Sequence, residues 1–381
     1  MNSASTPRVA RTLGALALAA MLGGCSFWGG PAKPKPADLG PNVPVLGVKQ
    51  AWTAKVGSTQ GLPLDIRVVN TTVFLASADG VVAAIDARTG GDLWRSDLKV
   101  QLSAGVGSDG KWTSVVSTKN ELITLADGRE SWRKPLTAKA YTAPLVAGNR
   151  VFVLAADRSL AAYDAATGQR LWLQQRPGEP LTLSQGVVLM AVGDTLVAGQ
   201  AGRLVGFNPD TGAVRWEAPL ASPRGTNDVE RLVEILGRTS RVGDSVCGRA
   251  FQATVGCVNA GRGTVQWTQP ANGAEGIHGD ESTLFGTESN GSVVAWKRSD
   301  GSKAWTSDRL QYRKLTAPLL LGRSVVIGDE SGLVHLLSRD DGSPLNRLTT
   351  DSSGVFTAPV AAGETLVVVT RNGTVYGFRP D

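Results

Sequence analysis

The chain has 381 residues, 42% of them hydrophobic, which is long enough to bury a large core. It contains 46 glycines and 19 prolines but only two histidines and three cysteines, which argues against a transition-metal site built from several such ligands. The formal net charge of +6 is small and spread along the chain, so the composition does not favour nucleic-acid binding.

The N-terminal 24 residues have the pattern of an export signal. Two arginines precede an apolar stretch, residues 13–24, that is too short to span a bilayer as a helix. The following LGGC motif (residues 22–25) resembles the bacterial lipobox, which predicts a signal peptide over 1–24 and a lipid anchor at Cys25. Ser26 after that cysteine implies delivery to the outer membrane. The alternative is an ordinary secretory signal followed by an incidental cysteine.

A proline-rich segment, residues 25–47, follows the predicted signal. Its prolines stand among glycine, alanine and lysine, a composition that cannot form a core and favours extended polyproline II. We therefore predict a tether over these residues.

One sequence pattern recurs beyond the tether. It is clear in AADRSLAAYDAATGQRLW (155–172) and in TESNGSVVAWKRSDGSKAW (287–305), where alternating residues end in a glycine turn followed four residues later by tryptophan. Alternation with period two predicts half-buried strands, and the glycine turns predict hairpins. Segments such as TAPLVAGNRVFVLAA (142–156) supply two more strands. Each repeat is thus expected to form four antiparallel strands.

The repeated tryptophans give the number of repeats. They recur at intervals near forty residues, with Asn346 where an eighth would stand: Trp52, Trp94, Trp132, Trp172, Trp216, Trp267 and Trp305. Four strands in such a period predict a β-propeller. The last repeat stops just after its third strand (372–381), whereas Trp52 lies in a lone fourth strand. We therefore predict an all-β, eight-bladed β-propeller of four-stranded antiparallel blades over residues 48–381, its ring closed by the N-terminal strand.

The turn sequence DAATGQRLW (164–172) contains an acid, a hydroxyl and a glycine, as an active site does. Because related strings recur in the other repeats, we interpret it as structural. The Asp164 carboxylate is expected to bond turn amides and Gly168 to adopt positive φ. Trp172 is expected to pack between neighbouring blades.

No catalytic, metal or cofactor site is predicted. His278 and His335 fall in different repeats without a second ligand at a suitable spacing, and no glycine-rich phosphate loop precedes a helix. The sequence RDDGS (339–343) lacks the spaced oxygen ligands and closing glutamate of a calcium loop.

Two cysteines remain, Cys247 and Cys257. They are symmetric about Gln252, so they would face each other on the arms of one hairpin. In an exported protein this arrangement allows a disulfide, and the alternative is a pair of small buried thiols.

The interval between Trp216 and Trp267 contains an insertion, residues 218–241. Four of its apolar residues have helical spacing: Val229, Leu232, Val233 and Leu236. The pattern predicts a short helix, whose apolar stripe either binds a partner or packs on its own blade.

The repeats are similar to those of quinoprotein alcohol dehydrogenases, eight-bladed propellers that bind pyrroloquinoline quinone and calcium. This chain is much shorter and lacks the adjacent cysteine pair common in that family. The resemblance therefore implies the fold and not the cofactor.

The export signal and the propeller together resemble the BamB family of outer-membrane-protein assembly factors. Matching segments include LTL (181–183), VERLVEI (229–235), AFQATVGC (250–257) and NGTVYGF (372–378). The resemblance implies a non-catalytic lipoprotein at the periplasmic face of the outer membrane that docks on the POTRA domains of BamA. The resemblance also suggests that the protein binds unfolded outer-membrane-protein clients.

The family's docking residues correspond to five positions here: Leu181, Leu183, Arg231, Leu232 and Glu234. Ser184 stands where the family commonly has arginine, and Leu236 where it has a second acid. Two other interpretations stay open, a quinone-dependent dehydrogenase and a lipoprotein propeller that binds another envelope partner.

Overall fold

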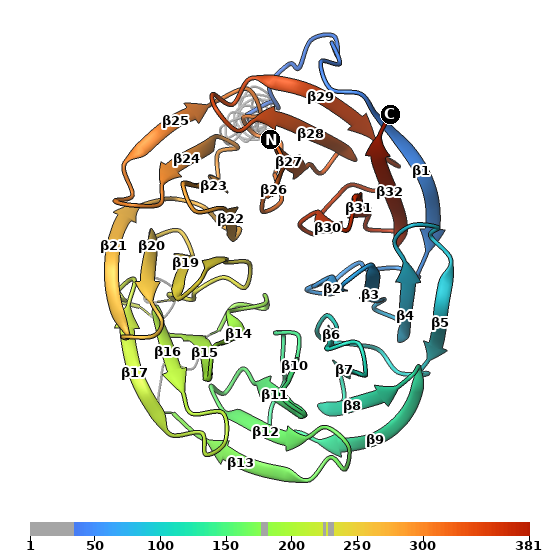
Figure 1. The fold of residues 1–381 in the computed structure, drawn as a ribbon, viewed down its shortest axis with the longest axis vertical. Helices are drawn as coiled ribbons and strands as arrows, with labels where there is room; N and C mark the ends of the chain where they lie inside the picture. The colour runs from blue at the N-terminus through green and yellow to red at the C-terminus, as the bar shows by residue number, and fades with distance from the viewer. Residues whose placement is uncertain (1–33, 177–181, 224–225, 228–231) are drawn as a thin grey trace, which may run out of the picture. The chain divides into compact units, whose positions relative to one another are not determined.

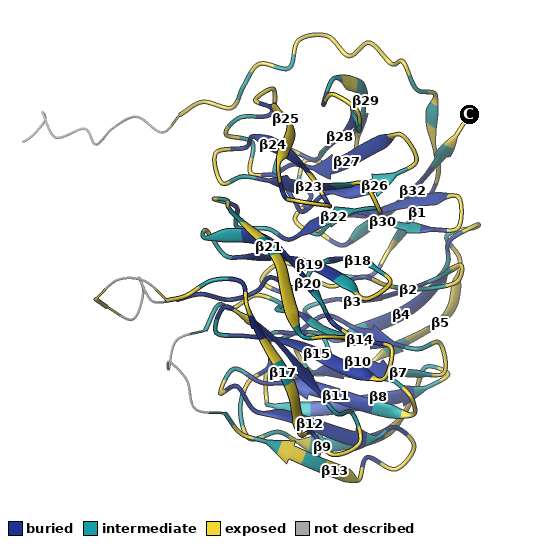
Figure 2. Cartoon of the chain, turned by 60° about the vertical axis from the view of Figure 1, so that its left-hand side comes forward, coloured by how far each residue is buried: buried dark blue, intermediate teal, exposed yellow. Residues whose placement is uncertain are grey.

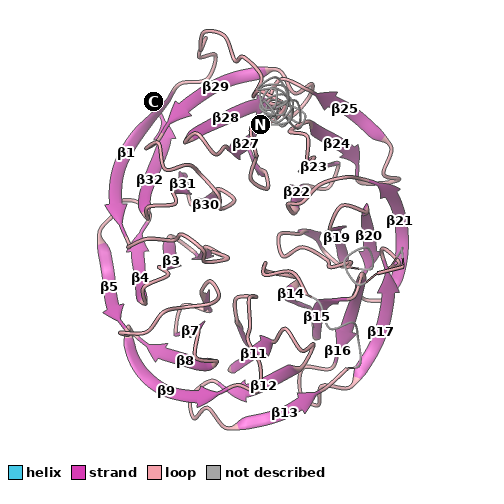
Figure 3. Ribbon diagram, turned by 180° about the vertical axis from the view of Figure 1, so that it is seen from behind, coloured by secondary structure: helices cyan, strands magenta, loops and turns pink. Residues whose placement is uncertain are grey.

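The computed structural model describes residues 34–176, 182–223, 226–227 and 232–381. It divides the chain into two compact units, Met1–Pro36 and Ala37–Asp381. The second unit is a ring of eight four-stranded antiparallel sheets arranged around a central opening (Figure 1). The described part of the chain consists of strands, turns and loops and contains no helix (Figure 3). It therefore also contains no helix long and apolar enough to cross a membrane.

Each blade is numbered here in chain order, and its strands run outward from the centre of the ring. Blades 1 to 4 consist of β2 (Arg67–Val69), β3 (Thr72–Ala76), β4 (Val81–Asp86), β5 (Asp92–Asp97); β6 (Gly107–Ser108), β7 (Trp112–Val116), β8 (Glu121–Ala126), β9 (Arg129–Pro135); β10 (Leu145–Ala147), β11 (Arg150–Leu154), β12 (Leu160–Asp164), β13 (Arg170–Gln174); and β14 (Leu189–Val192), β15 (Thr195–Gln200), β16 (Arg203–Phe207), β17 (Val214–Pro219). Blades 5 to 8 consist of β18 (Ser240–Val242), β19 (Ser245–Ala250), β20 (Thr254–Asn259), β21 (Thr264–Pro270); β22 (Ile277–Gly279), β23 (Thr283–Thr287), β24 (Val293–Lys297), β25 (Lys303–Ser307); β26 (Leu319–Leu321), β27 (Ser324–Gly328), β28 (Leu333–Ser338), β29 (Pro344–Thr349); and β30 (Val360–Ala362), β31 (Thr365–Val369), β32 (Thr374–Pro380), β1 (Val48–Lys55).

Blade 8 is completed by the N-terminal strand. β1 pairs antiparallel with β32, from Val48 opposite Pro380 to Lys55 opposite Thr374, with an irregularity between Gln50 and Trp52. The predicted propeller, its number of blades and its closure by the N-terminal strand are therefore confirmed. Closure by pairing leaves the third strand of blade 8 without an open edge.

The core lies between the blades. The middle strands are buried on both faces, whereas the outermost strands expose alternate residues (Figure 2). One apolar cluster, for example, joins Phe152 and Leu154 of blade 3 to Leu196 and Val205 of blade 4. Period-two alternation in the fourth strands and continuous apolar runs in the second strands follow from this arrangement.

The recurrent tryptophans pack on the recurrent glycines of the next blade. Each glycine lies at positive φ in the turn between third and fourth strands, and a Cβ there would come within 2.9 Å or less of the ring system of the preceding tryptophan: Gly90 on Trp52, Gly128 on Trp94, Gly168 on Trp132, Gly212 on Trp172, Gly263 on Trp216, Gly301 on Trp267 and Gly342 on Trp305. Five of the indoles also donate from Nε1 to a carbonyl of the same turn, at 2.7–2.9 Å. The turn and the tryptophan thus form one docking unit between blades.

The string DAATGQRLW forms such a turn. The Asp164 carboxylate accepts hydrogen bonds from the Thr167 hydroxyl and from the amides of Thr167 and Ala166, and these bonds hold the pKa of Asp164 below its usual range. Gly168 has a φ of 68°. The structural interpretation of this motif is confirmed.

The predicted tether differs from the structure over its second half. The compact unit begins at Ala37, because residues from Ala37 to Gly47 bond to the propeller. Leu39 and Leu46 are partly buried against the apolar clusters of blades 6 to 8, which a solvated tether would not be.

Candidate functional site

The candidate partner-binding residues lie in two connections between blades. Leu183 is in the connection from β13 to β14, and Leu232 and Glu234 are in the connection from β17 to β18. Both run from the outermost strand of one blade to the innermost strand of the next, so they lie on the same face of the ring. Leu181 and Arg231 lie outside the described residues, as does the predicted anchor Cys25.

Backbone hydrogen bonds join the two connections directly. The Val188 amide donates to Ile235 O at 3.1 Å, and the Gly237 amide donates to Gly186 O at 2.9 Å. An isolated antiparallel bridge pairs Val187 with Leu236. The two segments, which are about fifty residues apart in the sequence, therefore form one continuous surface.

The insertion does not form the predicted helix where the structure describes it. Residues 232–234 have no regular structure, and Ile235 and Leu236 each form a β-bridge. Val233 and Ile235 are buried in a cluster with Val188 and Leu220. The apolar stripe thus packs largely on its own propeller, because bridge pairing satisfies the backbone and the side chains of Val233, Ile235 and Leu236 are all buried.

Glu234 is buried, although the family resemblance implies an acidic contact with a partner. Its side chain is 5% exposed and its Oε1 lies 3.6 Å from Nη2 of Arg158. Arg158 belongs to the hairpin between β11 and β12 and has a φ of 65°. Burial raises the pKa of Glu234 to about 6, against the lowering effect of Arg158. In this structure the carboxylate therefore fastens the insertion to blade 3.

Sequence reasoning missed Arg158. The available signal was the turn AADR (155–158), in which Arg158 stands where the equivalent turns SADG (77–80) and ESNG (288–291) have glycine.

Leu183 and Glu234 line a common notch together with Arg158 and Gln200. Its volume is about 30 Å³, which holds one or two water molecules and no larger ligand. Leu183 and Leu232 are partly buried, and Ser184 beside them is exposed. The exposed part of this surface is thus a small apolar area with polar neighbours, and the ion pair lies beneath it.

A larger cavity, of about 440 Å³, opens beside the notch at the centre of the ring. Its lining includes Asp65, Arg238 and Glu275. Desolvation raises the pKa of Asp65 and raises that of Glu275 to about 7, while it lowers the pKa of Arg238 to about 10. His278 accepts a hydrogen bond from the Leu320 amide at Nδ1, and desolvation lowers its pKa to about 4, so this ring is neutral at pH 7.

Among the described residues, no group of three or more histidine, cysteine or acidic side chains is arranged to hold a metal ion. The central cavity presents two carboxyl groups, of Asp65 and Glu275, and the side chains of two arginines, Arg238 and Arg371, at its wall. This donor set does not resemble a calcium site, which needs six or more oxygens around one point.

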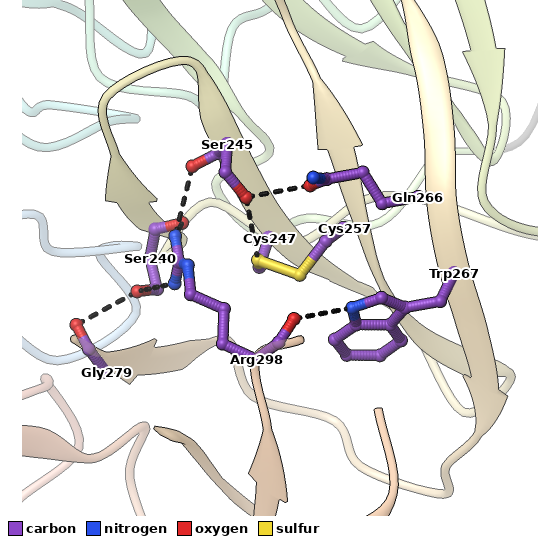
Figure 4. The surroundings of a disulfide bond; sticks show 8 residues. All are labelled: Ser240, Ser245, Cys247, Cys257, Gln266, Trp267, Gly279 and Arg298. Atoms are coloured by element: carbon purple, nitrogen blue, oxygen red, sulfur yellow. Dashed lines mark hydrogen bonds between the residues drawn. A yellow bond between two sulfur atoms is a disulfide. The ribbon is translucent and has the colours of Figure 1, made fainter. Parts of the chain in front are cut away.

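Blade 5, which follows the insertion, contains a disulfide between Cys247 and Cys257 (Figure 4). The two cysteines are directly opposite in the β19–β20 pair, as their symmetry about Gln252 predicts. Both are fully buried, close to Arg298, whose carbonyl accepts the indole hydrogen of Trp267 and whose guanidinium donates to Ser240. The disulfide is thus part of the contact between blades 5 and 6.

Comparison with known proteins identifies the family. Residues 78–307 match the family model described as outer membrane protein assembly factor BamB. The outer membrane protein assembly factor BamB of Burkholderia pseudomallei is 38% identical over 352 residues, which is 92% of either chain. The crystal structure of BamB from Moraxella catarrhalis superposes with a TM-score of 0.79 at 21% identity and covers 87% of this chain and 99% of that one.

A quinohemoprotein alcohol dehydrogenase from Comamonas testosteroni also superposes, with a TM-score of 0.66 at 16% identity over 88% of this chain and 76% of that one. At this identity the likeness shows the fold alone. The family-model match and the high identity over nearly the whole chain decide the relationship: the chain belongs to the family of outer membrane protein assembly factors named BamB.

Proposed function

We propose that this chain is a non-catalytic scaffold in the assembly of outer-membrane β-barrel proteins. Family membership supports the assembly role, and the lipobox at Cys25 supports a lipid-anchored protein at the periplasmic face of the outer membrane. Its partner is a POTRA domain of a BamA-type barrel protein, and no cofactor takes part.

The observation that carries the proposal is the joining of two distant connections into one surface. The hydrogen bonds between Val188 and Ile235 and between Gly237 and Gly186 fix Leu183 and Leu232 on the same face. An apolar centre surrounded by a polar rim is typical of protein interfaces. Leu181 and Arg231 are the remaining proposed contacts.

Glu234 has a supporting role in this proposal. Its ion pair with Arg158 holds the insertion in place, so that removal of one partner takes this counter-charge from the other buried group. In this proposal the carboxylate of Glu234 supports the docking surface from below and does not itself contact the partner.

The test is co-purification of the full-length lipoprotein with the BamA-type partner from detergent-solubilised membranes. The substitution Leu183→Asp should reduce co-purification by about tenfold or more, because it places a charge at an apolar contact. Leu93→Asp is the matched control, since Leu93 is 58% exposed on the outer wall of blade 1. Full co-purification of a folded Leu183→Asp variant would contradict the assignment of this surface.

A charge swap separates support from direct contact at Glu234. Glu234→Lys alone should weaken binding, and Glu234→Lys combined with Arg158→Glu should restore it if the pair is structural. Restored folding without restored binding would show instead that Glu234 contacts the partner directly.

The outermost strands also support a weaker interaction with unfolded clients. Leu171 and Leu173 of β13 and Val214 of β17 are exposed on strands whose outer edges face solvent. Such edges accept an added strand by main-chain pairing.

A further inference from the structure

Asn346 is the exception among the recurrent tryptophan positions. In β29 it pairs with Leu336, the same register in which Trp305 pairs with Ala295 in the preceding blade. A tryptophan here would need a glycine turn in blade 8 on which to pack. Blade 8 has none, because its third and fourth strands, β32 and β1, come from opposite ends of the chain.

The segment before β1 occupies the place of the missing turn. Asn346 Nδ2 donates to Leu46 O at 2.7 Å, just as the indoles of the other blades donate to a turn carbonyl. Asn42 Nδ2 in turn donates to Asn346 Oδ1 at 3.1 Å. An asparagine can donate and accept at once, whereas an indole only donates, so the substitution fits a bound chain segment.

The same segment is attached at its other end. The Ala37 amide donates to Gln311 O at 2.9 Å, and Arg313 Nη2 donates to Ala37 O at 2.6 Å. Between these ends Arg347 Nη2 donates to Gly40 O at 3.0 Å. The apolar contacts of Leu39 and Leu46 lie near the two ends.

We propose that residues 37–47 form a strap that binds blade 7 and determines where the membrane-anchor segment leaves the propeller. Among the eight blades, blade 7 alone has asparagine in place of tryptophan in its outer strand. The residue that binds this segment is therefore also the one that departs from the repeat pattern. The proposal rests on the proposed function only in taking Cys25 as the anchor.

The strap leaves the propeller on the face that carries the candidate docking surface. Gln311 and Arg313 lie in the connection from β25 to β26, which is equivalent in topology to the connections that carry Leu183 and Glu234. Figure 1 shows blade 7 (β26–β29) across the ring from blade 3 (β10–β13). The anchor exit and the docking surface are therefore on one face and at opposite edges of it.

The bound strap limits how far the propeller can lie from the membrane. If the strap stays bound, only residues 26–36 separate the anchor from the propeller, which reach roughly 40 Å when fully extended. A tether that extended to residue 47 would reach roughly 75 Å. The bound strap thus keeps the edge of the propeller at which the anchor segment leaves closer to the bilayer than a fully released tether would.

Hydrogen exchange of the full-length lipidated protein tests the strap independently of its partner. The amides of Ala37 and Val45, which donate to Gln311 O and Leu345 O, should exchange at least about tenfold more slowly than an unstructured peptide. Asn42→Ala should remove most of this protection and leave blade 3 unchanged. Unprotected amides in the unsubstituted protein would overturn the proposal.

A pair of insertions tests the consequence for reach. About six Gly/Ser residues inserted after Lys35 should raise the propeller above vesicles that carry the lipidated protein, whereas the same insert after Gly40 should not, since both ends of the strap stay bound. Energy transfer from a fluorophore at Lys119→Cys to labelled lipid headgroups reports the height. Equal effects of the two inserts would refute the strap, and failure of the protein to float with the vesicles would refute the anchor at Cys25 instead.

Discussion

Gly168 meets two requirements at once. Its φ of 68° lies in the left-handed region, and a Cβ would come within 2.7 Å of the Trp132 ring. The same two requirements recur at the other docking turns. The positive φ and the close contact with tryptophan together explain why glycine stands at this position in repeat after repeat. The sequence predicts the glycine turn itself. It does not show which tryptophan the glycine contacts, because that tryptophan lies in the preceding blade.

Gly168→Ala should lower the free energy of unfolding by about 2–4 kcal/mol, because backbone strain and overlap with Trp132 add. Gly193→Ala is the control, since Gly193 has a φ of 56° with no atom within 4 Å of the added Cβ. It should cost only about 1–2 kcal/mol, which is the strain alone. Urea unfolding followed by tryptophan fluorescence measures both, and equal losses would contradict the contact.

The pKa of Glu234 makes part of the stability depend on pH. The folded protein binds this proton more tightly than the unfolded chain, whose glutamate has its ordinary pKa of 4.5, so stability is lost as pH rises. Relative to a Glu234→Gln variant, the protein should lose about 2 kcal/mol between pH 4 and pH 7. Urea unfolding of both proteins across this range is the measurement. Parallel profiles would show that burial does not perturb this group.

At the scale of single elements, the period of the hydrophobic pattern predicted strands well and the insertion poorly. The second, third and fourth strands of each blade are five or more residues long, and each is paired with a neighbouring strand of its blade. In the insertion the apolar residues also fit helical spacing, and such short runs do not distinguish the two periods. The bridges of Ile235 to Ala250 and of Leu236 to Val187 decide the conformation, and these partners are remote in the sequence.

The disulfide in blade 5 stabilises a single hairpin. Its two cysteines are ten residues apart, so the chain-entropy model gives about 2–3 kcal/mol for the closed loop. Urea unfolding in the presence of a reductant should show this loss. The Cys247→Ala/Cys257→Ala variant should be insensitive to reductant, and an insensitive unsubstituted protein would indicate that the disulfide contributes nothing.

At the scale of the whole molecule, stability depends on how the ring is closed. In blades 1 to 7 all four strands are consecutive in the chain, whereas in blade 8 the β1–β32 pair brings together the two ends of the chain without a covalent turn between them. Trp52 is buried and packs on Gly90 of blade 1, so β1 contributes both to its own sheet and to the next interface. Loss of β1 would leave β32 as an open edge.

Trp52→Ala should therefore destabilise the protein by about 3–5 kcal/mol and also promote aggregation, because β1 then detaches and exposes β32. Trp305→Ala is the matched control, as Trp305 makes the same contact with Gly342 and donates to Arg339 O within the continuous part of the ring. It should destabilise the protein without the same aggregation. Light scattering during thermal unfolding distinguishes the two, and identical scattering would contradict a special role for closure.

The amino-acid sequence by itself determined the strands, the docking turns, the number of blades and the closure of the ring. It could do so because these features are local or periodic and recur along the chain. Only the tertiary structure decided that Glu234 is buried against Arg158, that the insertion joins the β13–β14 connection, and that residues 37–47 bind beside Asn346. Each of these features depends on a contact between segments that are separated in the sequence. Each such contact occurs only once, so the repeat pattern does not predict it.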